Sequence, residues 1–117
     1  MYINTMYSKE LLKGTLSTII LRLLSQKEKM YGYEITQRVK ILSEGKIEFK
    51  EGSLYPSLHK LKDDGLINTE KEMVNNRVRK YYYLTAKGKE ASQEKVAELN
   101  QFIFTLQKII SVHPIVS

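Results

Sequence analysis

Apolar positions at helical spacing mark the first part of the chain. Residues 9–25 are apolar on more than one side, which predicts a helix buried between partners rather than one lying on a surface. After a polar turn, residues 31–43 predict a second helix, with Ile35, Val39 and Leu42 facing inward. Two helices are therefore expected before residue 45.

The next stretch gives the most regular helical pattern. The alternation at residues 46–49 first predicts one short strand. Leu54, Leu58 and Leu61 then fall at i, i+4 and i+7, which places one apolar stripe on a helix over residues 52–64. The other side of that helix presents groups that can reach phosphates or base edges: Ser53, Ser57, His59, Lys60 and Lys62.

Two extended runs follow and predict a hairpin. Gly65 supplies the left-handed residue that a helix C-terminal cap favours. The runs are residues 66–73 and 79–85, joined by residues 74–78. Strand alternation separates the middle one of the tyrosines at 81–83 from its neighbours, so part of the set is expected in the core. Packing is therefore favoured over a stacking platform for single-stranded nucleic acid.

A long last helix is predicted over residues 86–112, with Thr85 as its N-cap and Pro114 as its stop. Its apolar residues follow spacings of four and three, the pattern of a coiled-coil seam. A dimer interface is therefore expected here rather than a ligand-binding box. The seam positions are Ser92, Val96, Leu99, Ile103, Leu106 and Ile110, and Phe102 and Ile109 widen the seam.

Composition limits the class of protein. A chain of 117 residues with 42% hydrophobic residues is expected to form one domain with a modest core. Its net charge of +6 favours a polyanionic partner, either nucleic acid or an anionic membrane surface. The sequence has no cysteine, which excludes disulfides and thiolate metal sites, and its apolar runs are too short to cross a bilayer. A soluble, cytoplasmic protein is expected.

The sequence offers no recognisable catalytic arrangement. Its two histidines, His59 and His113, have no cluster of further metal ligands nearby. There is also no glycine-rich phosphate loop and no nucleophile beside a base in a known setting. Neither an enzyme, a metal site nor a cofactor is expected.

A polar-faced helix followed by a cationic hairpin predicts double-stranded DNA as the partner. Residues 74–89 carry five basic side chains and no acidic one. This order of elements is how a winged helix-turn-helix engages DNA, with the helix in the major groove and the hairpin against the backbone. The predicted fold is therefore mainly α with a small β-hairpin (α+β), a winged helix-turn-helix followed by a long C-terminal dimerisation helix.

Several short strings are specific as a set, through their order and spacing. They are LLKGTL at 11–16, ILRLL at 20–24, YGYEI at 31–35, EGSLYP at 51–56 with Leu58 and Leu61, GLI at 65–67, and RKYYYLT at 79–85 with Gly88. On these strings the chain resembles the PadR family of bacterial transcriptional regulators, in its branch with a single dimerising helix. The family often has glycines at the wing tip, where this chain has Asn75 and Asn76. Some relatives bind flat aromatic molecules between tryptophans, which this chain lacks.

The pattern and the resemblance together predict a sequence-specific DNA-binding regulator, a repressor that acts as a homodimer on an inverted-repeat operator. Residues 1–8 are expected to form an arm, 9–85 the DNA-binding domain, and 86–117 the dimerisation helix and tail. The candidate DNA contacts are Ser53, Tyr55, Ser57, His59, Lys60, Asn76, Arg77, Arg79 and Lys80. The candidate dimer contacts are Leu16, Ile20, Val96, Leu99, Phe102, Ile103, Leu106 and Ile110.

Some alternatives stay open at this point. Tyr55 either packs inward or projects its hydroxyl towards a phosphate. Arg79 and Lys80 both sit beside the hairpin tip, and one of them is a candidate for folding back along the strand. Two other functions are also considered: a sensor whose DNA binding is controlled by a small hydrophobic molecule, and a winged helix that serves only as a protein-interaction module.

Overall fold

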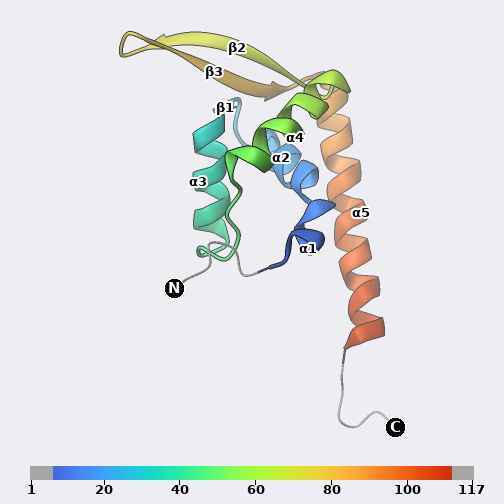
Figure 1. Ribbon diagram of the computed structural model, residues 1–117. Helices are drawn as coiled ribbons and strands as arrows, with labels where there is room; N and C mark the ends of the chain where they lie inside the picture. The colour runs from blue at the N-terminus through green and yellow to red at the C-terminus, as the bar shows by residue number, and fades with distance from the viewer. Residues whose placement is uncertain (1–6, 112–117) are drawn as a thin grey trace, which may run out of the picture.

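The computed structural model describes residues 7–111. Its helices pack against one face of a small antiparallel sheet, and the last helix runs down one side (Figure 1). This arrangement confirms the predicted mainly α, winged-helix fold. The elements are α1 (Lys9–Lys13), α2 (Leu16–Gln26), β1 (Met30–Tyr31), α3 (Gly32–Leu42), α4 (Glu51–Asp63), β2 (Ile67–Val74), β3 (Arg77–Leu84) and α5 (Ala86–Ile110).

The first predicted helix is in fact two, so the prediction of one helix over residues 9–25 is wrong. Helix α1 ends at Lys13, just before Gly14, and glycine costs about 1 kcal/mol relative to alanine inside a helix. The Thr15 hydroxyl then donates to the Leu12 carbonyl at 2.9 Å, a local bond that competes with helix continuation. The restarted helix α2 supplies much of the core.

The sheet has three strands in the order β1-β3-β2. Strand β1 is only two residues long and was not predicted. It pairs antiparallel with β3, Met30 opposite Tyr82 and Tyr31 opposite Tyr81. A strand this short has no period of its own in the sequence, because its pairing partner lies about fifty residues further along the chain.

The strand predicted at residues 46–49 is wrong, because this segment is a loop. Its backbone bonds to a side chain instead of a strand: the Ile47 amide donates to Ser43 Oγ at 2.9 Å, and the Ser43 hydroxyl lies 3.2 Å from the Ile47 carbonyl. Phe49 nevertheless joins the core. Leu42, predicted to face inward, is 58% exposed at the end of α3.

The hairpin of β2 and β3 is regular along its full length. Its register runs from Ile67 opposite Leu84 to Val74 opposite Arg77. The turn is therefore only Asn75 and Asn76, with φ of 50° and 63°, rather than the five residues expected. Both values lie in the left-handed region that asparagine tolerates and that the favoured two-residue hairpin turn requires.

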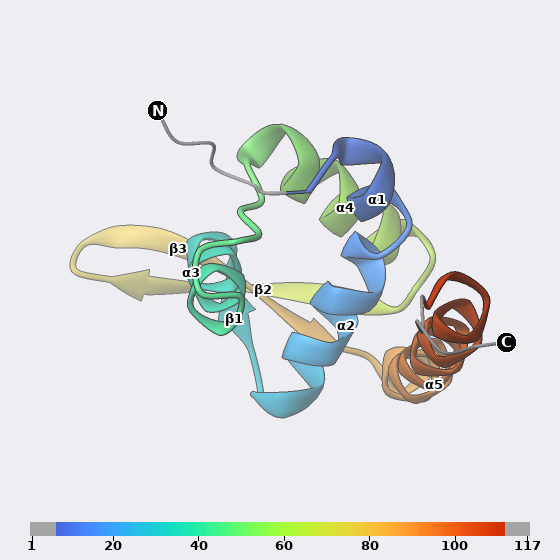
Figure 2. The same ribbon diagram turned by 90° about the horizontal axis from the view of Figure 1, so that it is seen from below.

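Helix α5 is anchored at its first turns. Thr85 is the N-cap as predicted, since its Oγ1 accepts from the Gly88 amide at 3.0 Å. The buried Ser92 hydroxyl donates to the Leu21 carbonyl at 3.2 Å and so joins α5 to α2. The helix ends at Ile110, and the predicted stop at Pro114 lies outside the described residues. Figure 2 shows α5 on one side of the molecule and the hairpin reaching out on the other.

Candidate nucleic-acid interface

Helix α4 presents a polar face to solvent. Leu54, Leu58 and Leu61 are buried in the core, which confirms the predicted apolar stripe. The five candidate DNA-contacting residues of this helix therefore lie away from that stripe, and only Ser57 is partly covered. The exposed ones are Ser53, Tyr55, His59 and Lys60.

Two side-chain contacts, one of them an ion pair, lie along this face. His59 Nε2 is 3.5 Å from an oxygen of Asp63, and Lys60 Nζ is 3.4 Å from an oxygen of Asp64. Exposed pairs of this kind contribute at most about 1 kcal/mol, so a phosphate or a guanine edge can compete for Lys60 at low cost. These contacts therefore leave the polar face of α4 accessible.

Tyr55 packs against the start of α3. A Cβ built on the buried Gly32 would lie 2.4 Å from the Tyr55 hydroxyl oxygen, so the glycine makes room for the phenol. Tyr55 still leaves 43% of its surface exposed. The ring thus ties α4 to the preceding helix, which is the first of the two alternatives, and part of the side chain stays accessible. Its contact with a phosphate stays a prediction.

The hairpin, referred to below as the wing, has two chemically different faces. Strand alternation and the pairing register assign each side chain to one of them. The inner face, whose base packs into the core, consists of Ile67, Thr69, Lys71, Met73, Val78, Lys80, Tyr82 and Leu84. The outer face consists of Asn68, Glu70, Glu72, Val74, Arg77, Arg79, Tyr81 and Tyr83. The buried Tyr82 between half-buried Tyr81 and Tyr83 confirms the predicted alternation.

On the outer face, Arg79 folds back over aromatic rings. Its guanidinium carbon lies 4.1 Å from the centroid of the Tyr31 ring, and Tyr31 meets Tyr81 edge to face with centroids 5.6 Å apart. Hydrogen bonding to Tyr81 raises the pKa of Arg79 above its ordinary value. Of the two residues considered for folding back, Arg79 is therefore the one that does so, while Lys80 lies on the inner face.

Lys29 ties the outer face to the loop before β1. Its ammonium lies 2.7 Å from Glu70, pairs with Glu72 as well, and sits 4.9 Å from the centroid of the Tyr81 ring. The hydrogen bond to Glu70 is the main reason why the pKa of Lys29 is raised. The sequence around Lys29 predicts only a polar turn, because its carboxylate partners are about forty residues away.

Asn76 and Arg77, both candidate DNA contacts, are exposed at the wing tip. Lys71 is a basic residue that sequence analysis did not single out, and it lies directly opposite Lys80 on the inner face. Once the turn is known to be two residues long, the pairing of these lysines follows from counting. The signal was present in the sequence but needed the correct turn length.

Helix α5 carries exposed apolar side chains beyond the body of the protein. Four of the candidate dimer residues are exposed here, and Ile109 adds to the same side of the helix, whereas Phe104 is exposed on the other side. The four are Phe102, Ile103, Leu106 and Ile110. By contrast, Val96 and Leu99 are half-buried, and Ser92, predicted in the same seam, is buried against α2. Only the C-terminal half of the predicted seam is fully open to a second chain.

Two other candidate dimer residues do not lie on the surface. Leu16 is 8% exposed and Ile20 is 0% exposed, and both belong to the core of this chain. The prediction that they line an interface is corrected accordingly, since the helix they occupy buries its most apolar side within the core of its own chain. Helix α2 was expected to be buried between partners, and these partners are α4, α5 and β3 of the same chain.

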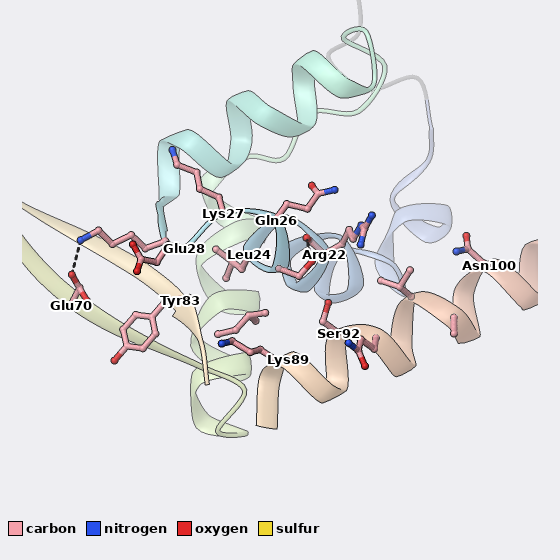
Figure 3. Close-up of a pocket in the computed structure, with 16 residues that line it drawn as sticks. Arg22, Leu24, Gln26, Lys27, Glu28, Glu70, Tyr83, Lys89, Ser92 and Asn100 are labelled. Atoms are coloured by element: carbon pink, nitrogen blue, oxygen red, sulfur yellow. Dashed lines mark hydrogen bonds and ion pairs between the residues drawn. The ribbon is translucent and has the colours of Figure 1, made fainter. Parts of the chain in front are cut away.

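A groove of about 1170 Å³ lies between the end of α2, the outer face of the wing and α5 (Figure 3). Leu24, Leu84 and Val96 contribute apolar surface to it. Most of its lining is polar or charged: Arg22, Ser25, Gln26, Lys27, Glu28, Lys29, Glu70, Lys89, Gln93 and Asn100. Tyr83 is the one aromatic residue in its lining.

Among residues 7–111, no three His, Cys, Asp or Glu side chains come together in a way that could hold a metal ion. None of the helices described has both the length and the hydropathy needed to span a membrane.

The chain is similar to known proteins in sequence and in structure. The profile of the transcriptional regulator PadR-like family matches residues 20–94. An uncharacterised protein of Lysinibacillus sphaericus is 33% identical over 94 residues, covering 80% of this chain and 85% of that protein. A transcriptional regulator of Mycobacterium tuberculosis is 37% identical over 65 residues, covering 56% of this chain and 58% of the relative.

Solved structures give the same result. A transcriptional regulator from Clostridium thermocellum superposes with a TM-score of 0.80 at 28% identity, covering 90% of this chain and 99% of that one. A PadR-like transcription factor from Bacteroides fragilis superposes with a TM-score of 0.68 at 35% identity, covering 86% of this chain and 95% of its own. The helices and the wing described above are thus a known arrangement.

Proposed function

Because the chain belongs to the PadR-like family of transcriptional regulators, we propose that it is a repressor that binds an inverted-repeat operator in duplex DNA as a homodimer. The observation that carries this proposal is the polar face of α4, which is exposed on the same molecule as a cationic wing. In a winged helix the corresponding helix enters the major groove, where the donor and acceptor pattern of each base pair is distinct.

We assign the recognition of the DNA base sequence to helix α4. Ser53 and Ser57 can donate or accept hydrogen bonds, His59 can do either, and Lys60 can reach a guanine edge or a phosphate. We assign Tyr55 to the phosphate backbone of DNA rather than to the bases, since the contact with Gly32 fixes the position of its ring. The three buried leucines of α4 are excluded from direct contact.

The wing is assigned affinity rather than specificity. Asn76, Arg77 and Lys80 lie at or near its tip, where flexible cations can reach phosphates or the minor groove. Arg79 is assigned a positioning role, because stacking on Tyr31 engages its guanidinium within the protein.

The second chain is expected on the exposed apolar surface of α5. An apolar stripe of this size is unusual on a protein that remains monomeric. In this arrangement residues 9–85 form the DNA-binding unit, and the helix after them joins two such units about a two-fold axis. Half-sites are then expected about 10 bp apart, or a multiple of that.

The groove of Figure 3 bears on the sensor alternative. Its lining carries both signs of charge and several amides, which suits a polar ligand better than a flat hydrophobic one. The sensor of a hydrophobic molecule is therefore the weaker alternative, and DNA binding without a required ligand is the function proposed.

Selection of binding sites from random duplexes tests the proposal. The parent should enrich an inverted repeat, while Ser57→Ala and Lys60→Ala should each relax the preference at particular positions, by about 1–3 kcal/mol where a bidentate contact is lost. Lys95→Ala removes a charge from α5 instead of α4 and serves as the control. If both α4 variants recover the parent motif with equal stringency, α4 is not the reader. If the parent enriches nothing even at low salt, the protein-interaction alternative is favoured.

A further inference from the structure

The inner face of the wing continues past the core with four side chains. They form two directly opposite pairs, Lys71 with Lys80 and Met73 with Val78. Closer to the base of the wing, the same face supplies Ile67, Tyr82 and Leu84 to the core. The distal part of this face therefore has a composition of its own: two cations, then two apolar residues nearest the turn.

The lysine pair is unfavourable in the free protein. Like charges directly opposite on neighbouring strands destabilise a hairpin. Every residue of the inner face is neutral apart from these two lysines, and among residues 7–111 neither of them lies within ion-pair distance of a carboxylate. The two glutamates of the hairpin lie on the outer face, paired with Lys29.

The apolar pair is left uncovered in the free protein. Met73 is 70% exposed and Val78 is 63% exposed, so the pair adds nothing to the core. The lysine pair lies between it and the buried residues of the same face. An exposed apolar cross-strand pair on an open hairpin is a liability unless another molecule covers it.

We propose that the inner face of the wing is the face that meets DNA, with Lys71 and Lys80 on phosphates and the Met73–Val78 pair against the sugars of the minor groove. This assignment rests on the proposed function and specifies how the wing carries it out. Phosphates relieve the repulsion between the lysines by supplying the counter-charge that the hairpin lacks on this side. The walls of the minor groove are built from deoxyribose, and apolar side chains are known to enter that groove beside cations.

The alternative is contact through the outer face. That face has Arg77 at its tip, but Glu70 and Glu72 lie on it and would approach the phosphates as well. Its other arginine, Arg79, is stacked on Tyr31. Charge complementarity therefore favours the inner face, and Arg77 is left as a contact at the turn, where the two faces meet.

The salt dependence of duplex binding distinguishes the two faces. Fluorescence anisotropy of the full-length protein with a labelled duplex, from low to moderate salt, gives the slope of log K against log salt. The double variant Lys71→Gln with Lys80→Gln should lower the slope by roughly two for each wing bound. The matched control, Lys95→Gln with Lys108→Gln, removes the same charge from α5 and should change the slope little.

The apolar pair is tested without changing charge. Met73→Gln and Val78→Thr nearly conserve the shape of each side chain. Together they should raise Kd roughly tenfold and leave the salt slope as in the parent. Thermal unfolding should be unchanged, because both side chains are exposed.

The outcomes separate this inference from the proposed function. If the double lysine variant keeps the salt slope of the parent and Arg77→Gln lowers it, the contact lies on the outer face. That result would overturn the inference and leave DNA binding intact. An unchanged Kd for the apolar variant would overturn the minor-groove contact. A parent that shows no salt-dependent duplex binding would instead remove the proposed function itself.

Discussion

Replacing Gly88 with alanine tests the junction between the wing and α5. A Cβ at this position would lie 1.8 Å from the Leu66 carbonyl oxygen and 2.9 Å from its carbon, whereas real Cβ contacts are essentially never under 3.0 Å. The obstacle is backbone rather than the end of a flexible side chain. Helix α5 and the Leu66 carbonyl must therefore move apart, although three hydrogen bonds hold this region together.

Those bonds allow an estimate of the cost. The Thr85 amide donates to the Leu66 carbonyl at 3.1 Å, the Thr85 hydroxyl donates to the Gly65 carbonyl at 2.7 Å, and the Gly88 amide donates to Thr85 Oγ1 at 3.0 Å. Losing two of them costs about 2 kcal/mol, and overpacking adds about 1–3 kcal/mol. Alanine returns at most about 1 kcal/mol through its helix propensity. We expect Gly88→Ala to lower the free energy of unfolding by about 2–4 kcal/mol.

Urea unfolding followed by circular dichroism measures this change. All proteins should be compared at one concentration, since association would stabilise the folded state. Gly52→Ala is the matched control, because a Cβ on Gly52 in α4 has no atom within 4 Å. It should leave stability unchanged or raise it by up to about 1 kcal/mol. A Gly88→Ala protein as stable as the Gly52→Ala protein would refute the close approach of α5 to Leu66.

The remaining predictions concern α3, the turn, the last helix and alkaline pH. Gly32→Ala should displace Tyr55 and weaken DNA binding at least as much as Tyr55→Phe does, as measured by anisotropy titrations. Equal binding by Gly32→Ala and the parent would contradict the contact between Gly32 and Tyr55. Asn75→Ala should cost about 1 kcal/mol of stability in urea unfolding, because alanine is strained at positive φ. Leu106→Asp should convert a dimer into monomer or aggregate in light scattering, and a parent that is monomeric at micromolar concentration would contradict the proposed assembly. Burial raises the pKa of Tyr82. Its contribution to the free energy of unfolding is therefore complete below about pH 10 and is lost as the pH rises through the pKa of the folded state. In unfolding experiments at alkaline pH, Tyr82→Phe should lose less stability than the parent.

The parts of the fold that sequence predicted are those set by short-range pattern. The leucine stripe of α4, the N-cap at Thr85 and the alternation of the tyrosines at 81–83 each depend on residues within a turn or a strand of one another. For the same reason, the left-handed conformation of Gly65 could be predicted. Chemistry and spacing are enough in these places because no distant partner is involved.

The parts that were missed depend on distant partners or on register. Strand β1 exists because β3 lies beside it, and the role of Lys29 depends on carboxylates of β2. The roles of Arg79 and Lys71 depend on which face of the wing each occupies, and this was hidden by an assumed turn of five residues. The burial of Leu16 also depends on distant partners. An apolar helix predicts that its side chains are buried, but it does not show whether the same chain or a second chain covers them.

The anchoring of α5 at one end has a consequence for how the molecule responds to its own concentration. Its first turns are held by Gly88 and Ser92, whereas the side chains of residues 101–110 are all exposed. A helical stretch that packs on nothing is marginal in water, and its amides open readily to solvent. If a second copy covers this stretch, its helical order and association become one equilibrium. Amide hydrogen exchange there should then slow as protein concentration rises, while exchange in α2 stays constant.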